Sequence, residues 1–149
     1  QDAPYFFVYH FIKGPDEQKK LSNLELRCQH QNRRKTVKQQ AIALAATLDK
    51  NAYFAQRIRG IDCASHEIGC PPEVFAQAFR YLRSFQHTRY FQKRLFSDEV
   101  HHLLSATYHA GEDFLDIASA LRTIDEAVEF LELQRGDRIG HALGLGWIR

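Results

Sequence analysis

Leu103-Leu-Ser-Ala-Thr-Tyr-His109 is an apolar segment that Ala110-Gly111 interrupts, and it predicts a buried β-strand. The next long segment, residues 114–133, predicts an amphipathic helix, and Arg138-Ile-Gly-His-Ala-Leu143 predicts a further strand. A helix that connects two strands in this way is typical of a parallel sheet. The apolar positions that give the helical spacing are Leu115, Ile117, Ala118, Leu121, Ile124, Val128 and Leu131.

The half of the chain before residue 103 shows the same alternation of strands and helices. Residues 5–12 are aromatic and β-branched and end at Lys13-Gly14-Pro15, which predicts a strand buried on both faces. Residues 83–99 are polar and aromatic with weak periodicity, and we expect an inserted loop or a short helix there. The other predicted elements are a helix at residues 27–49, a strand at 58–62 and a helix at 73–82 that follows two prolines. Four such strand-and-helix steps indicate an α/β fold with right-handed crossovers.

Composition limits the classes to which the protein can belong. The chain has 149 residues, of which 44% are hydrophobic and 26% charged, as in ordinary globular domains. Its formal net charge of +2 gives no broad electrostatic surface for nucleic acid, so we expect no nucleic-acid partner. No apolar run approaches the roughly 20 residues that a membrane span needs, and we expect no membrane association.

The cysteines and the N-terminus indicate a cytoplasmic protein. The three cysteines, Cys28, Cys63 and Cys70, are an odd number without C-x-x-C spacing, so we expect three buried thiols in a reducing compartment. No signal peptide is visible at the N-terminus. Because the chain contains no methionine, even at position 1, we interpret it as a piece of a longer protein.

Three polar motifs fall at the C-terminal ends of predicted strands, where parallel α/β proteins gather their reactive groups. They are Gly60-Ile-Asp62 with Glu67, His109-Ala-Gly-Glu112, and Arg138-Ile-Gly-His141. Two histidines and a carboxylate at neighbouring strand ends can converge on a metal ion and its water. Taken singly, each histidine is equally compatible with a hydrogen-bonded core position, and each acid with a helix N-cap.

Together and in this order, the motifs resemble those of the adenosine deaminase family. That family carries G-I-D-L-x-G-x-E, H-A-G-E and R-[IV]-G-H-G on consecutive strands, and this chain carries Gly60-Ile-Asp-Cys-Ala-Ser-His-Glu67, His109-Ala-Gly-Glu112 and Arg138-Ile-Gly-His-Ala142. The resemblance implies an eight-stranded (β/α)8 TIM barrel. Residues 1–149 would then be the central fragment of a single domain, covering about strands three to six with their helices.

The resemblance also implies a role for individual residues. His109 would be a zinc ligand, Glu112 would protonate purine N1 as water adds to C6, and His141 would orient or deprotonate that water. Proton donation by Glu112 needs a carboxyl group that its surroundings keep protonated. The substrate-binding residues would be Asp62, Ser65, Glu67 and Gly111.

This sequence departs from the family pattern at several positions. Ser65 and Ala142 stand where the family has glycine. The family also binds zinc through an H-x-H pair on the first strand and an aspartate on the eighth, and no H-x-H occurs in this chain. Because a (β/α)8 barrel takes about 250 residues, we expect the remaining zinc ligands to lie outside the chain and activity only in the full-length parent.

The function that we expect is zinc-dependent hydrolytic deamination of adenosine, or of a related adenine nucleoside or nucleotide, to the inosine form and ammonia. The partner would be a small purine molecule, and assembly as a homo-oligomer stays open. One alternative is a non-catalytic barrel relative that acts as a structural or interaction subunit. Another is a metal-dependent hydrolase of a different amine, because His109, Glu112 and His141 indicate the chemistry better than the substrate.

Overall fold

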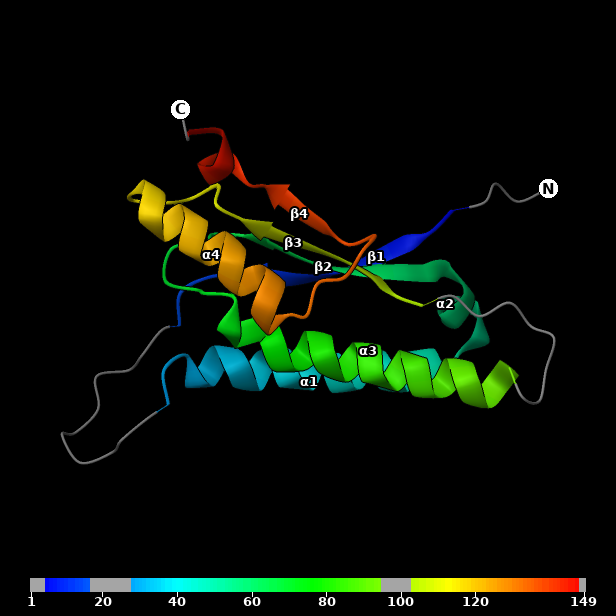
Figure 1. The fold of residues 1–149 in the computed structure, drawn as a ribbon. Coiled ribbons are helices and arrows are strands. Elements are labelled where there is room, and N and C mark those ends of the chain that lie inside the picture. The colour runs from blue at the N-terminus through cyan, green and yellow to red at the C-terminus, as the bar shows by residue number, and fades with distance from the viewer. Residues whose placement is uncertain (1–4, 17–27, 95–102, 148–149) are drawn as a thin grey trace, which may run out of the picture.

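The protein contains one sheet of four parallel strands that alternate with helices, as its computed structural model shows (Figure 1). The structure describes residues 5–16, 28–94 and 103–147. The strands are neighbours in chain order, β1-β2-β3-β4, which confirms the predicted parallel α/β fold. Their bounds are β1 Phe7–Lys13, β2 Ile58–Ser65, β3 Ser105–Ala110 and β4 Arg138–His141.

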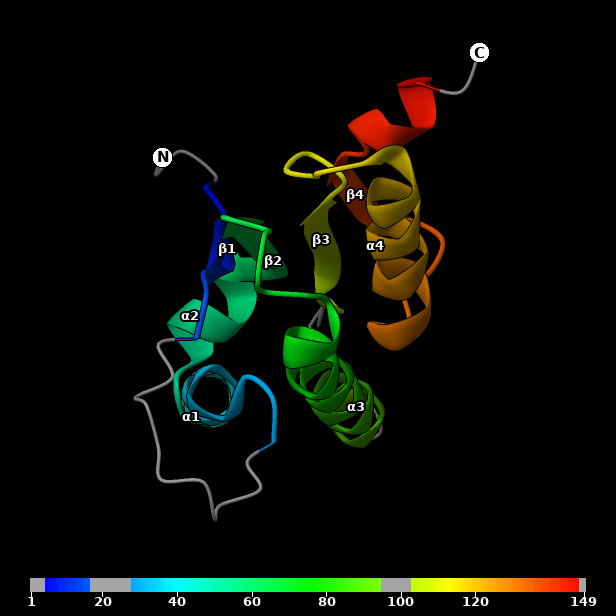
Figure 2. The same ribbon diagram turned by 90° about the vertical axis from the view of Figure 1, so that its left-hand side faces the viewer.

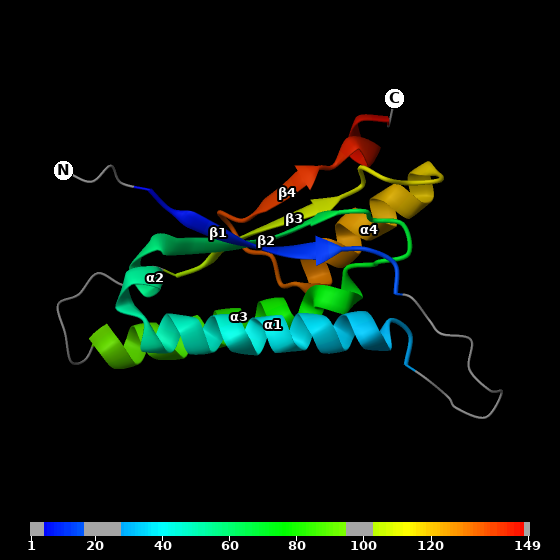
Figure 3. The ribbon, with the colours of Figure 1, turned by 180° about the vertical axis from the view of Figure 1, so that it is seen from behind.

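The three long helices pack on one side of this sheet, as the end view and the view from behind show (Figures 2 and 3). They are α1 Gln31–Lys50, α3 Glu73–Arg94 and α4 Ile117–Phe130, and the short helices are α2 Ala52–Arg57 and the 3-10 turn η1 Leu143–Trp147. Right-handed crossovers that always step in the same direction place every connecting helix on the same face of a sheet. The strand order therefore accounts for the one-sided arrangement of the helices.

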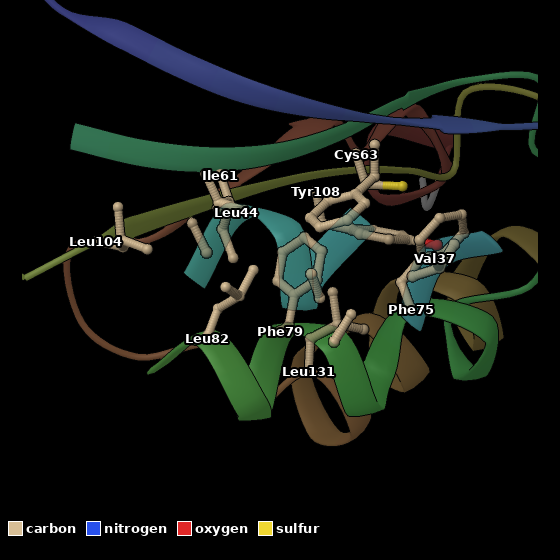
Figure 4. Packing of buried hydrophobic residues seen from close by; sticks show 14 of the residues in the cluster. Val37, Leu44, Ile61, Cys63, Phe75, Phe79, Leu82, Leu104, Tyr108 and Leu131 are labelled. Atoms are coloured by element: carbon tan, nitrogen blue, oxygen red, sulfur yellow. The ribbon is translucent and has the colours of Figure 1, made fainter. Parts of the chain in front are cut away.

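Between the sheet and the helices lies one hydrophobic core, built from alternate residues of each strand (Figure 4). Tyr108 on β3 is fully buried, and its ring meets those of Phe75 and Phe79 from α3 at centroid distances of 6.1 Å. Phe79 also packs 5.9 Å from Phe11 on β1. The other strand residues that face this core include Ile61, Cys63, Ala106 and Ala110.

The opposite face of the sheet is open in the part of the chain that the structure describes. Val8 and Ile12 on β1 are 50% and 64% exposed, whereas Phe11, which points toward the helices, is completely buried. The prediction of a first strand buried on both faces is therefore wrong for the described residues. No described helix crosses this side, so the apolar residues of β1 that point away from α1 have nothing to cover them.

Two other expectations need correction. Helix α3 continues to Arg94, so the predicted loop or short helix after residue 82 is instead part of a 22-residue helix, and residues 95–99 lie outside the described part. That segment contains no glycine or proline to end the helix, and Gln86 is buried on the same side as Leu82. Cys28 is exposed, so only Cys63 and Cys70 are the buried thiols that we expected.

Helix α2 has no counterpart among the elements predicted from the sequence. The side chain of Asn51 caps this helix by accepting a hydrogen bond from the Phe54 amide at 3.3 Å. Asp116 caps α4 in the same way, through the Ser119 amide at 2.9 Å, which sets the start of α4 three residues after the predicted one. Among the described residues, no helix is both long and apolar enough to cross a membrane.

Replacing Phe79 with alanine should destabilise the fold strongly, because its ring joins α3 to both β1 and β3. We expect the free energy of unfolding to fall by about 3–5 kcal/mol. Leu115→Ala is the control, since Leu115 is 84% exposed, and it should change the value by less than about 0.5 kcal/mol. Urea unfolding measures both, and similar losses in the two variants would contradict this core.

Candidate functional site

The predicted polar motifs meet at one edge of the sheet, where the parallel strands end. Residues His109 and Ala110 of β3 pair with Gly140 and His141 of β4, so the two histidines lie on neighbouring strand ends. Their ring centroids are 5.0 Å apart. Glu112 follows β3 in the turn after Gly111, which brings its carboxylate toward the same place.

His109, Glu112 and His141 form a compact cluster. Each offers one potential metal-ligand atom, and these atoms lie within 4.8 Å of one another. His141 Nε2 lies 3.1 Å from Glu112 Oε2, which is hydrogen-bonding distance. The side chains of Glu112 and His141 are 43% and 41% exposed, whereas that of His109 is 25% exposed. The cluster is therefore open to a small molecule on the side of the Glu112–His141 pair.

Gly140 makes room for His109. A Cβ atom at position 140 would lie 2.8 Å from Cγ and 2.9 Å from Cδ2 of the His109 imidazole, closer than real Cβ contacts come. The glycine of the R-I-G-H motif therefore lets the ring lie against the backbone of β4. This is a structural reason for a residue that the sequence motif alone left unexplained.

Glu67 fixes the turn that carries Glu112. Its carboxylate is buried and accepts hydrogen bonds from the Gly111 amide at 2.8 Å and the Glu112 amide at 3.4 Å. Gly111 has a φ of +73°, and a Cβ there would lie 2.8 Å from Ile124 Cδ1, so the turn needs glycine at this position. Both Glu67 and the Gly111 amide, which we predicted to bind substrate, are thus engaged with each other beneath the cluster.

Sequence reasoning missed Lys13, which supports the same turn from β1. Lys13 is only 2% exposed, and its ammonium group donates a hydrogen bond to the carbonyl oxygen of His109. The Nζ atom lies 3.9 Å from Glu67 Oε1 and 3.9 Å from the centroid of the Tyr108 ring. Burial lowers the pKa of Lys13, and the nearby Cys63 and Glu67 oppose that shift. The alternation of side chains along β1 indicates that Lys13 is buried, because Lys13 falls two residues after the core residue Phe11.

Asp62 lies beside His109 on the open face of the sheet. Its Oδ2 atom is 2.8 Å from His10 Nδ1 and 3.6 Å from His109 Nε2. The Asp62 side chain is only 5% exposed, and its other oxygen, Oδ1, has no hydrogen-bond partner among the described residues. The register pairs His10 with Asp62, which explains why both side chains project from the same face.

Ser65 lies at the exposed end of β2 and is not a member of the His109, Glu112 and His141 cluster. Its φ is +87°, in the region that favours glycine, and His141 and Ala142 also have positive φ values, +62° and +48°. Backbone of this kind costs about 1–3 kcal/mol at residues other than glycine and is concentrated at functional sites. The strand ends therefore carry local strain next to the cluster.

Searches against models of known protein families and against curated proteins found no match for this chain. The function must therefore be inferred from the geometry of this cluster and from the resemblance of its motifs.

The fit of His109 against β4 can be tested by adding one methyl group. Gly140→Ala should push the His109 ring away from β4 and lower the free energy of unfolding by about 1–3 kcal/mol, because the added methyl group overlaps the imidazole. Gly146→Ala is the control, because no atom lies within 4 Å of a Cβ at that position. Urea unfolding measures the stability of both variants, and equal values would contradict the close approach.

Relief of backbone strain gives a second test. Ser65→Gly should raise the free energy of unfolding by about 0.5–1 kcal/mol, because glycine adopts positive φ without steric cost. Ser84→Gly is the matched control inside α3, where glycine should instead lower stability by about 0.5 kcal/mol. Thermal and urea unfolding measure the changes, and a loss of stability in Ser65→Gly would show that position 65 is unstrained.

Proposed function

We propose that the chain forms four consecutive strands of a (β/α)8 barrel. Two observations support this: the strands follow one another in chain order, and α1, α3 and α4 all pack on one face of the sheet. A doubly wound sheet instead reverses its strand order and has helices on both faces. In a barrel the open face of this sheet, with Asp62 and His109, would point to the interior, and the cluster would lie at the catalytic end.

We further propose that the site belongs to a zinc-dependent aminohydrolase that converts adenosine, or a related adenine nucleoside or nucleotide, to the inosine form and ammonia. The observation that carries the proposal is the convergence of His109, Glu112 and His141 at two neighbouring strand ends. These are the residues to which the motif resemblance gives the chemistry. Their order along the chain and their meeting in space are independent observations that agree.

The two departures from the family pattern also support the resemblance. Ser65 and Ala142 stand where the family has glycine, and both have positive φ values of +87° and +48°. Only a few per cent of residues other than glycine adopt such backbone. At both positions where the motifs lack the family's glycine, the backbone therefore adopts a conformation that favours glycine.

The donors at the site fit zinc. Imidazole nitrogen and carboxylate oxygen are common zinc ligands, and a catalytic zinc site leaves one position for water. His109, the least exposed member of the cluster, would hold the ion, with further ligands outside this chain. When bound, zinc acts as a Lewis acid that lowers the pKa of water toward neutrality.

The Glu112–His141 pair would move the protons of the reaction. Water adds to C6 of the purine, and His141 takes a proton from that water while Glu112 gives a proton to N1. His141 would then return its proton to the nitrogen at C6, and the Glu112 carboxylate would take the hydroxyl proton as the C6–N bond breaks and the carbonyl forms. Adenosine and water thus become inosine and ammonia, and both side chains regain their starting protonation. The 3.1 Å contact between His141 Nε2 and Glu112 Oε2 keeps donor and acceptor together. Glu67 and Lys13 form hydrogen bonds with backbone groups of the turn that follows β3. These bonds limit the movement of Glu112.

Two substitutions test these roles in the full-length protein loaded with zinc. His109→Ala should remove both the metal and the activity, whereas Glu112→Gln should keep the metal and lower kcat by about 10²–10⁴-fold. Glu129→Gln, on the exposed surface of α4, is the control and should leave both unchanged. Turnover is followed by the ultraviolet spectral change of adenosine, and bound metal by elemental analysis.

The outcomes separate the candidate functions. Full activity in either His109→Ala or Glu112→Gln would contradict the assignment of the site. Bound zinc without conversion of any adenine compound would favour a hydrolase of another amine, and absence of any turnover would favour a non-catalytic barrel relative.

A further inference from the structure

Two His–carboxylate pairs lie at the site, and their spacing differs. His141 and Glu112 are 3.1 Å apart, at hydrogen-bonding distance. His109 Nε2 and Asp62 Oδ2 are 3.6 Å apart, which is too long for a hydrogen bond. No hydrogen bond therefore explains why the His109 and Asp62 side chains lie so close together.

The longer distance suits two ligands of one ion. Zinc lies about 2.0–2.2 Å from nitrogen and oxygen ligands, so two ligand atoms at a tetrahedral angle are separated by about 3.3–3.6 Å. The 3.6 Å between His109 Nε2 and Asp62 Oδ2 falls at the end of this range. The spacing thus distinguishes a pair suited to share a cation from a pair suited to share a proton.

One oxygen of the buried Asp62 carboxylate also has no hydrogen-bond partner among the described residues. Only 5% of the Asp62 side chain is exposed. The oxygen without a partner in the described part of the chain is Oδ1. Lys13, which follows the core residue Phe11 by two positions on β1, already pairs with Glu67 and with the His109 carbonyl. A carboxylate buried in this way is costly unless a cation or further donors satisfy it.

His10 holds the Asp62 carboxylate in place. Its Nδ1 lies 2.8 Å from the same Oδ2 atom, and its side chain is 57% exposed on the open face of the sheet. Carboxylates that bind metal ions are regularly held by such a neighbouring hydrogen bond. His10 thus fixes the position of the Asp62 carboxylate.

We infer that Asp62, positioned by His10, is a second ligand for the divalent cation that His109 binds, rather than a residue that contacts the purine. This inference deepens the proposed function, on which it rests for the identity of the ion as zinc. It adds to the site a carboxylate that the motif resemblance places among the substrate-binding residues.

Cobalt binding to the full-length protein, freed of metal by chelation, tests the inference. Asp62→Asn keeps the shape of the side chain and removes its charge, and it should weaken Co²⁺ binding by at least about tenfold; His10→Ala should weaken it by about tenfold. Asp125→Asn, an exposed aspartate on α4, is the matched control and should bind as the unmodified protein does. Circular dichroism confirms that each variant is folded.

A cysteine at the same position distinguishes a direct ligand from a supporting residue. Asp62→Cys should give a thiolate-to-Co²⁺ charge-transfer band in the near ultraviolet, because the metal–sulfur bond of about 2.3 Å offsets the shorter side chain. Asp125→Cys and the unmodified protein, which contain the same native cysteines as Asp62→Cys, should lack this band. The band needs direct coordination, so a residue that only stabilises the fold cannot produce it.

Unchanged Co²⁺ affinity in Asp62→Asn, or Co²⁺ bound by Asp62→Cys without the band, would overturn the inference. Failure of the proposed function is a separate result. If the band is present but the protein converts no adenine compound, Asp62 is a ligand and the deaminase proposal fails. If adenosine is converted while Asp62→Asn binds cobalt normally, the deaminase proposal stands and the inference fails.

Discussion

The buried contact between Lys13 and Glu67 connects the core of the protein to the sheet edge that carries the candidate site. The ammonium group comes from β1, the carboxylate follows β2, and together they bind the carbonyl of His109 and the amides of Gly111 and Glu112. Because both charges are almost inaccessible to water, removing one would leave the other uncompensated. The position of the turn after β3, and with it that of Glu112, depends on this contact across three strands.

One face of the sheet carries the side chains of the hydrophobic core, and the other carries polar side chains of the candidate site. Phe11, Cys63 and Tyr108 point toward the helices and form the core, whereas His10, Asp62 and His109 alternate with them and point to the open face. A shift of one residue in any strand would exchange the two sets. The apolar pattern that stabilises the fold therefore also determines which polar groups meet at the site.

Much of the fold could be predicted from the sequence, because the apolar periods of residues 103–133 and the glycines at strand ends are local signals. The grouping of His109, Glu112 and His141 followed from the rule that parallel strands end at one edge. The contacts of Lys13 and His10 could not be predicted, because they depend on pairing between strands some 50 to 100 residues apart in sequence. The openness of one face of β1 was also beyond the sequence, since an apolar run does not show what covers each side.

The close approach of the His109 ring to Gly140 has a further consequence for the alignment of β3 and β4. His109 needs a neighbour without a side chain, and Gly140 is the only glycine in the strand segment Arg138–His141. If β4 slipped by two residues along β3, Arg138 or Ala142 would replace the glycine beneath the imidazole, and either side chain would collide with the ring. The glycine therefore disfavours a slip of two residues in either direction, and the observed alignment also places His141 next to Ala110.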